Sequence, residues 1–140
     1  MPSLSLWFIR TALLELLTGV TLGAAMLAAR GGSWAPRLAG LLPLHVELLV
    51  LGWLANLVIG VAYWMLPKYP TGRERGAGAP VVAAWVALNG GLLLVGLDLF
   101  PVAGRSAELL AVLLFATNAW PRVKPFGAGR PLRSELRAKS

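Results

Sequence analysis

Ionisable and amide side chains inside long apolar segments are the residues of this sequence whose types allow chemistry. His45, the only histidine, and Glu47 lie in the apolar segment 41–70, while Glu15 and Asn89 lie in two other apolar segments. A neutral imidazole can ligate a haem iron or another metal ion, and a carboxyl group in such a segment can carry a proton. Because ionisable groups are costly inside a membrane helix, these positions are candidates for a functional site.

His45 shares one face of its predicted helix with three further residues. At about 100° per residue, His45, Gly52, Asn56 and Tyr63 project along nearly one line, whereas Glu47 points almost to the opposite face. One interpretation is a cofactor site with His45 as the axial ligand of a haem iron, in which glycine leaves room for a flat macrocycle. The other is a polar seam between packed helices, with His45 hydrogen-bonded near the membrane surface.

Glu15 in the first apolar segment also has two interpretations. It can relay protons or bind a partner, or it can be paired with Arg10 or hydrogen-bonded inside the bundle. Gly19 and Gly23, which follow it, form a GxxxG step that permits close helix approach. The run 89–91, Asn-Gly-Gly, predicts a second close contact between helices.

The elements that must position these residues are four apolar helices. The chain of 140 residues is 57% hydrophobic and 14% charged, against about 25% charged in soluble proteins, and about 20 apolar residues suffice to cross a membrane. We therefore predict an all-α integral membrane four-helix bundle in residues 1–121, with spans at 6–29, 41–66, 80–100 and 107–120. Ser106 is the predicted N-cap of the last span, and residues 122–140 form a basic tail. The absence of cysteine excludes disulfides, thiolate metal sites and iron–sulfur clusters.

The distribution of positive charge predicts the orientation of this bundle. With four spans, every Lys and Arg except Arg30, Arg37 and Arg105 lies on the side of the two termini. The positive-inside rule then places both termini in the cytoplasm and His45 near the outer end of the second helix, with Tyr63 in the inner aromatic belt. We expect a multi-pass protein of the inner (cytoplasmic) membrane whose basic segments meet anionic lipid. Nucleic-acid binding is not expected, because no recognition motif accompanies the charge.

The second apolar segment resembles helix II of the catalytic subunit of haem–copper oxidases and nitric oxide reductases. That helix carries a low-spin haem ligand histidine near its outer end, matched here by His45, and closes with an aromatic-x-x-Pro motif, matched by Trp64 to Pro67 in the run YWMLP. The glycine-rich middle, with Gly52 and Gly60, and the opening run WFIRT at 7–11 are similar to the same family. The resemblance covers about half of the chain and implies a b-type haem held by His45.

The departures from that family limit what the resemblance implies. The sequence has a single histidine, so it lacks a second low-spin haem ligand and the histidine set of a binuclear oxygen or nitric oxide site. We therefore expect no enzyme activity from this chain alone. Two options remain: a homodimer in which each copy supplies one His45 to a bis-histidine haem, or a cofactor-free accessory subunit of a terminal oxidase or nitric oxide reductase.

Two alternatives belong to other functional classes. A small oligomeric transporter or channel component would use His45, Glu47, Glu15 and Asn89 to line a polar path, although no internal repeat or pair of broken helices is evident. A cofactor-free assembly factor would need none of these side chains for chemistry.

Overall fold

The computed structural model describes residues 2–68 and 78–123, and all of its regular structure is helical. The elements are α1 (Ser3–Ala28), α2 (Ala35–Ala39), α3 (Leu42–Glu47), the π-helix η1 (Leu48–Ala55), α4 (Asn56–Met65), α5 (Gly78–Gly96), α6 (Pro101–Ala119) and the 3₁₀ turn η2 (Trp120–Arg122). Four helical stretches are long and apolar enough to cross a membrane: Ser3–Ala28, Leu42–Met65, Gly78–Gly96 and Pro101–Arg122. The predicted all-α chain with four apolar helices is confirmed, and these helices indicate a multi-pass membrane protein.

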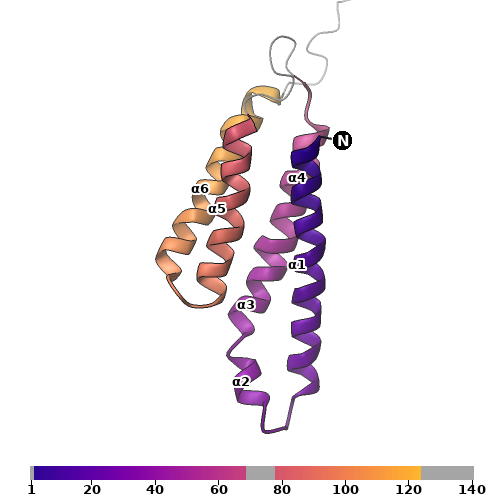
Figure 1. The fold of residues 1–140 in the computed structure, drawn as a ribbon, viewed down its shortest axis with the longest axis vertical. Helices are drawn as coiled ribbons and strands as arrows, with labels where there is room; N and C mark the ends of the chain where they lie inside the picture. The colour runs from indigo at the N-terminus through magenta and orange to yellow at the C-terminus, as the bar shows by residue number, and fades with distance from the viewer. Residues whose placement is uncertain (1, 69–77, 124–140) are drawn as a thin grey trace, which may run out of the picture.

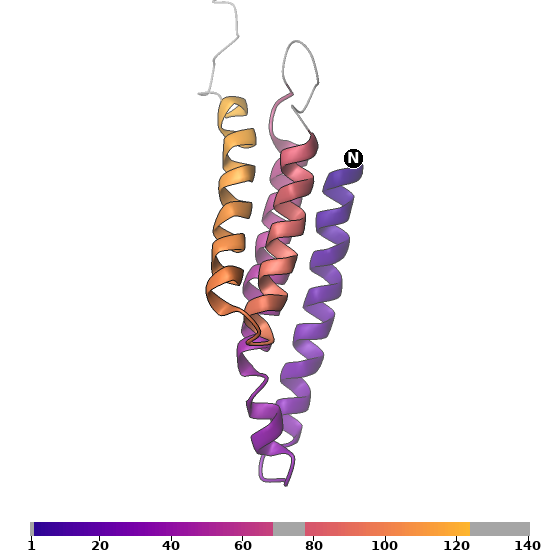
Figure 2. The ribbon, with the colours of Figure 1, turned by 60° about the vertical axis from the view of Figure 1, so that its left-hand side comes forward.

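The four helices form two antiparallel hairpins that lie side by side (Figures 1 and 2). The first pairs α1 with the continuous stretch α3–η1–α4, and the second pairs α5 with α6. The start of α1, the end of α4, the start of α5 and the end of α6 lie at one end of the molecule. The short helix α2 and the α5–α6 turn lie toward the other end, which we call the α2 end.

The second span is helical from Leu42 to Met65, one residue shorter at each end than predicted, and its middle is a π-helix. Leu48–Ala55 forms η1 between the α-helical segments α3 and α4. Stretches of π-helix are rare and occur mostly as short insertions, often at functional sites. The sequence pattern did not indicate this segment. Every residue from Leu48 to Ala55 except Gly52 is apolar, so no alternation of polar and apolar residues shows the helical repeat.

The third and fourth spans have different ends from those predicted. Helix α5 ends at Gly96, and α6 begins at Pro101, six residues before the predicted start. Proline suits the first helical turn, because backbone N–H groups there have no acceptor within the helix and proline lacks this group. Ser106 is therefore inside the helix and donates to the Val102 carbonyl at 2.9 Å instead of capping the N-terminus. The tight connection places Asp98 at φ 54°, a left-handed conformation that aspartate tolerates. The basic tail from residue 124 and the loop 69–77 lie outside the described residues.

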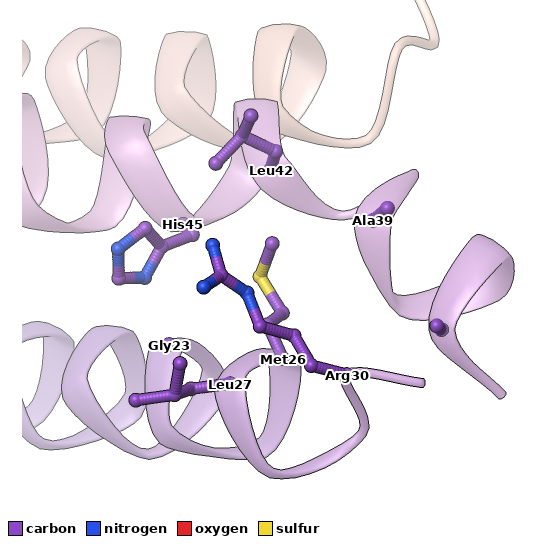
Figure 3. A pocket seen from close by; sticks show the side chains of 8 residues that line it. Gly23, Met26, Leu27, Arg30, Ala39, Leu42 and His45 are labelled. Carbon is purple, nitrogen blue, oxygen red and sulfur yellow. The ribbon is translucent and has the colours of Figure 1, made fainter. Parts of the chain in front are cut away.

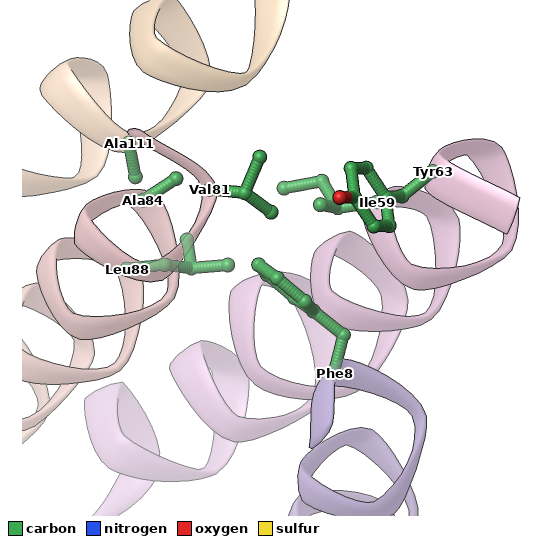
Figure 4. Close-up of a cluster of buried hydrophobic side chains, with 7 residues drawn as sticks. All are labelled: Phe8, Ile59, Tyr63, Val81, Ala84, Leu88 and Ala111. Carbon is green, nitrogen blue, oxygen red and sulfur yellow. The ribbon is translucent and has the colours of Figure 1, made fainter. Parts of the chain in front are cut away.

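A compact apolar core holds all four spans together near the end that carries the N-terminus (Figure 4). The phenyl ring of Phe8 extends from α1 toward α5, and the Tyr63 ring lies beside it on α4. Tyr63 is only 4% exposed, so it belongs to the core and not to the predicted aromatic belt. The buried members of the cluster are Phe8, Ile59, Tyr63, Val81, Ala84, Leu88 and Ala111.

Close approach of α5 to α6 depends on glycine. A Cβ atom placed on Gly91 would lie 2.7 Å from the Gly104 carbonyl oxygen and 2.8 Å from Cγ of Glu108. The neighbouring Gly90 faces open space, with nothing within 4 Å of its Cβ position. The contact predicted for the run 89–91 is thus confirmed, and Gly91 is the residue that makes it.

We expect opposite effects from alanine at these two glycines. Gly91→Ala forces α5 away from the α6 backbone and is expected to lower the free energy of unfolding by about 1–3 kcal/mol. Gly90→Ala introduces no clash and is expected to raise it by up to about 1 kcal/mol through helix propensity. Detergent-unfolding curves followed by circular dichroism measure both, and equal effects at the two positions would contradict this packing.

Candidate functional site

His45 lies against the GxxxG step of α1. Its Nδ1 atom is 2.9 Å from the Gly19 carbonyl oxygen. A Cβ atom on Gly23 would lie 2.5 Å from Cε1 of the imidazole ring, so only glycine leaves room for the ring at this position. At Gly19 the neighbour is Leu49, whose Cδ2 would lie 2.8 Å from such a Cβ. The predicted close approach at Gly19 and Gly23 is confirmed. The space that the His45 ring occupies against Gly23 is part of this contact.

A hollow of about 430 Å³ opens beside His45 at the α2 end (Figure 3). The Met26 thioether of α1 and the Arg30 guanidinium, from the turn directly after α1, extend into the space that faces α3. The remaining walls are apolar, so one imidazole and one cation are its ionisable groups. Its lining residues are Gly23, Met26, Leu27, Arg30, Ala35, Ala39, Leu42 and His45.

The other three residues of the predicted stripe do not line this hollow. Gly52 receives the Glu15 side chain, whose Cδ would lie 2.9 Å from a Cβ there, so the space expected for a macrocycle is filled by protein. Asn56 is fully buried between helices, and Tyr63 lies in the apolar core. The polar-seam interpretation therefore describes Gly52 and Asn56, whereas Tyr63 belongs to the apolar core. Of the four stripe residues, only His45 lines the hollow.

A network of side-chain hydrogen bonds joins α1, α4 and α5 near the middle of the bundle. Asn56 Nδ2 donates to Glu15 Oε2 at 3.0 Å and to Asn89 Oδ1 at 3.2 Å. Asn89 Nδ2 donates back to Asn56 Oδ1 at 3.4 Å and to the Trp85 carbonyl at 2.8 Å. Glu15 is thus hydrogen-bonded inside the bundle, as its structural interpretation predicts. We call Glu15, Asn56 and Asn89 the central polar network.

Glu47 belongs to a second polar group, which the sequence did not predict. Arg105 of α6 donates to both carboxylate oxygens of Glu47 and, through Nη1, to Glu108 Oε2 at 2.8 Å. Glu47 faces α6, whereas His45 faces α1, in agreement with the predicted opposite directions. Within residues 2–68 and 78–123, the hydrogen bonds of these three side chains go to different partners: His45 to the Gly19 carbonyl, Glu15 to Asn56, and Glu47 to Arg105.

Arg122 makes a second set of buried contacts that the sequence did not indicate. It is 1% exposed and donates to the carbonyl oxygens of Tyr63, Leu66 and Pro67, each at 3.0 Å. Its guanidinium also lies 5.3 Å from the centre of the Tyr63 ring. The sequence predicts only a membrane-flanking role for Arg122; in the structure it caps the C-terminus of α4, where a cation is favoured by the helix dipole. No sequence signal separates it from the basic residues after it.

Comparison with protein-family models, curated proteins and solved structures finds no match to this chain. The kinship with haem–copper oxidases therefore remains a hypothesis carried by the residues quoted above. Among the described residues, no group of three or more His, Cys, Asp or Glu side chains gathers as a metal site. A haem needs only one side chain per axial position, so this finding does not bear on haem binding.

Proposed function

We propose that this protein is a membrane subunit of a respiratory electron-transfer complex and that His45 is an axial ligand of a b-type haem. The observation that carries the proposal is the hydrogen bond between His45 Nδ1 and the Gly19 carbonyl oxygen. Because a carbonyl oxygen only accepts, the proton of the neutral ring lies on Nδ1, and Nε2 keeps its lone pair. Histidines that ligate metals almost always donate their other ring N–H in this way.

Because Glu15 fills the space at Gly52, the haem in this proposal would lie at the hollow beside His45. The hollow beside it has mostly apolar walls, and Arg30 supplies one cation that can pair with an acidic substituent of the macrocycle. A bound haem would supply one-electron transfer. The chain's own residues would hold the axial nitrogen in one tautomer and shield it from water. Since each chain has one histidine, a bis-histidine haem would need its second histidine from a second copy or from a partner subunit.

A reduced-minus-oxidised absorption spectrum of the purified full-length protein tests this function. We expect b-type haem bands in the wild type, and their complete loss in His45→Ala and His45→Gln. The glutamine variant matters because its side-chain amide can still donate to the Gly19 carbonyl while it offers iron no imidazole. Ser106→Ala, which removes an exposed hydroxyl on α6, is the control and is expected to keep the bands.

A haem-free accessory role has a different signature. In that case the wild type shows no haem bands alone or with its partners, and His45→Gln co-purifies with the same respiratory subunits as the wild type. Haem bands that persist in both His45 variants would overturn the assignment of the ligand.

A further inference from the structure

The group formed by Glu47, Arg105 and Glu108, which we call the carboxyl pair with its arginine, joins α3 to α6. The two glutamate side chains are only 7% and 8% exposed, whereas the Arg105 side chain is 56% exposed. The pair is therefore enclosed by protein, and the arginine separates it from the surface. None of the three residues takes part in the proposed haem site.

The charges of this group do not balance when all three side chains are ionised. Arg105 supplies one positive charge against two carboxylates. Both oxygens of Glu47 accept from the guanidinium, but only Oε2 of Glu108 does. Oε1 of Glu108 is buried and has no hydrogen-bond partner. A buried carboxylate oxygen without a donor is unfavourable, and a single added proton would make the group neutral.

The elements packed around the pair supply no second cation. Helix α5 meets Glu108 at Gly91, where the missing side chain leaves space for the glutamate. Helix α3 contributes Glu47, and α6 contributes Arg105 and Glu108. Asp98, in the turn before α6, is an exposed acid. Within the part of the chain that the structure describes, Arg105 is thus the one cation hydrogen-bonded to the pair.

Arg105 also connects the pair to the surface. It lines a shallow hollow of about 390 Å³ together with Pro101, Val102, Ser106 and Leu109, all on the first turns of α6. The Arg105 side chain, which is 56% exposed, therefore lies between this hollow and the buried carboxyl groups to which it donates.

We propose that the carboxyl pair with its arginine is a proton-binding site, in which Glu47 and Glu108 together hold one proton at neutral pH and exchange it through the hollow beside Arg105. The proton belongs to the coupled pair. Uptake converts one carboxylate to a neutral carboxylic acid, and release restores it, with no other bond made or broken.

Infrared spectroscopy of the full-length protein in lipid nanodiscs at pH 7 tests this proposal, since neutral carboxylic acids and carboxylates absorb at different frequencies. All samples carry Glu15→Gln, which removes the acid of the central polar network but keeps an acceptor for Asn56. We expect the intensity of one neutral carboxyl group, which shifts in heavy water. Glu108→Gln and Glu47→Gln should each abolish it, because one carboxylate and one guanidinium remain.

Arg105→Gln should act in the opposite direction and double the neutral carboxyl intensity, since both acids then lack a cation. Asp98→Asn, which removes an exposed acid at the same end, should leave the signal unchanged. Absence of a neutral carboxyl signal in the Glu15→Gln background would overturn the proposal without need of any further variant. A signal that survives Glu47→Gln would also overturn it, because the remaining ion pair of Glu108 and Arg105 is already neutral without an added proton. Both outcomes are independent of haem binding at His45.

Discussion

Replacing Arg122 by alanine is expected to lower the free energy of unfolding by about 3–5 kcal/mol. The substitution removes three hydrogen bonds from a charged donor, each worth about 1.5–3 kcal/mol but not additive, and leaves the carbonyl groups of Tyr63, Leu66 and Pro67 without that donor. It also removes the cation from the face of the Tyr63 ring. Unfolding of the purified protein by sodium dodecyl sulfate in mixed micelles, followed by circular dichroism, measures the change.

Two further variants separate the geometry of Arg122 from its charge. Arg122→Lys keeps the charge but replaces the planar fork with a single ammonium group, so we expect it to recover less than half of the loss. Arg10→Ala removes an exposed arginine from α1 and is expected to change the free energy of unfolding by no more than about 0.5 kcal/mol. If Arg122→Ala were as mild as Arg10→Ala, the capping role would be refuted.

Replacing Asn56 by alanine is expected to be the second most damaging of these changes, at about 2 kcal/mol. Asn56 is 0% exposed and makes three hydrogen bonds to Glu15 and Asn89. Single interhelical hydrogen bonds in membranes contribute about 0.6 kcal/mol on average and up to about 1.7 kcal/mol, and this substitution breaks three of them at once. The same unfolding assay measures the effect.

The controls for Asn56 use polar residues with fewer interhelical bonds. Thr18→Ala removes an exposed hydroxyl bonded only within α1, to the Leu14 carbonyl, and should be nearly neutral. Asn89→Ala combined with Asn56→Ala should cost less than the sum of the two single changes, because the same bonds are lost in each. Strict additivity would mean that the two amides do not act as one network.

The sequence predicted those parts of the fold that depend on composition and on small residues. Four apolar runs became four helices, and the glycines of the step 19–23 and of the run 89–91 became close helix contacts. His45 lies on a face distinct from that of Glu47, as a helical wheel predicts. These features follow from local periodicity and size, which a single sequence carries.

The features that the sequence did not predict depend on contacts between distant segments. Arg105 and Arg122 look like ordinary membrane-flanking cations until α6 is placed beside α3 and α4. The sequence suggests space for a cofactor at Gly52, because it does not reveal that the Glu15 side chain of α1 points toward this glycine. The six-residue error at the start of α6 arose because Pro101 to Ser106 is too mixed in polarity to read as membrane-spanning.

The attachment of α6 at both of its ends has a consequence for biogenesis. Two arginines complete the second span: Arg105 of α6 forms an ion pair with Glu47, and Arg122, in the turn η2 directly after α6, donates to the carbonyl groups at the end of α4. Because ribosomes deliver α6 after α3 and α4, Glu47 lacks its cation and the end of α4 lacks its cap until α6 and η2 are in place. The interval between synthesis of α4 and of η2 is therefore when the second span most needs the protection of the insertion machinery.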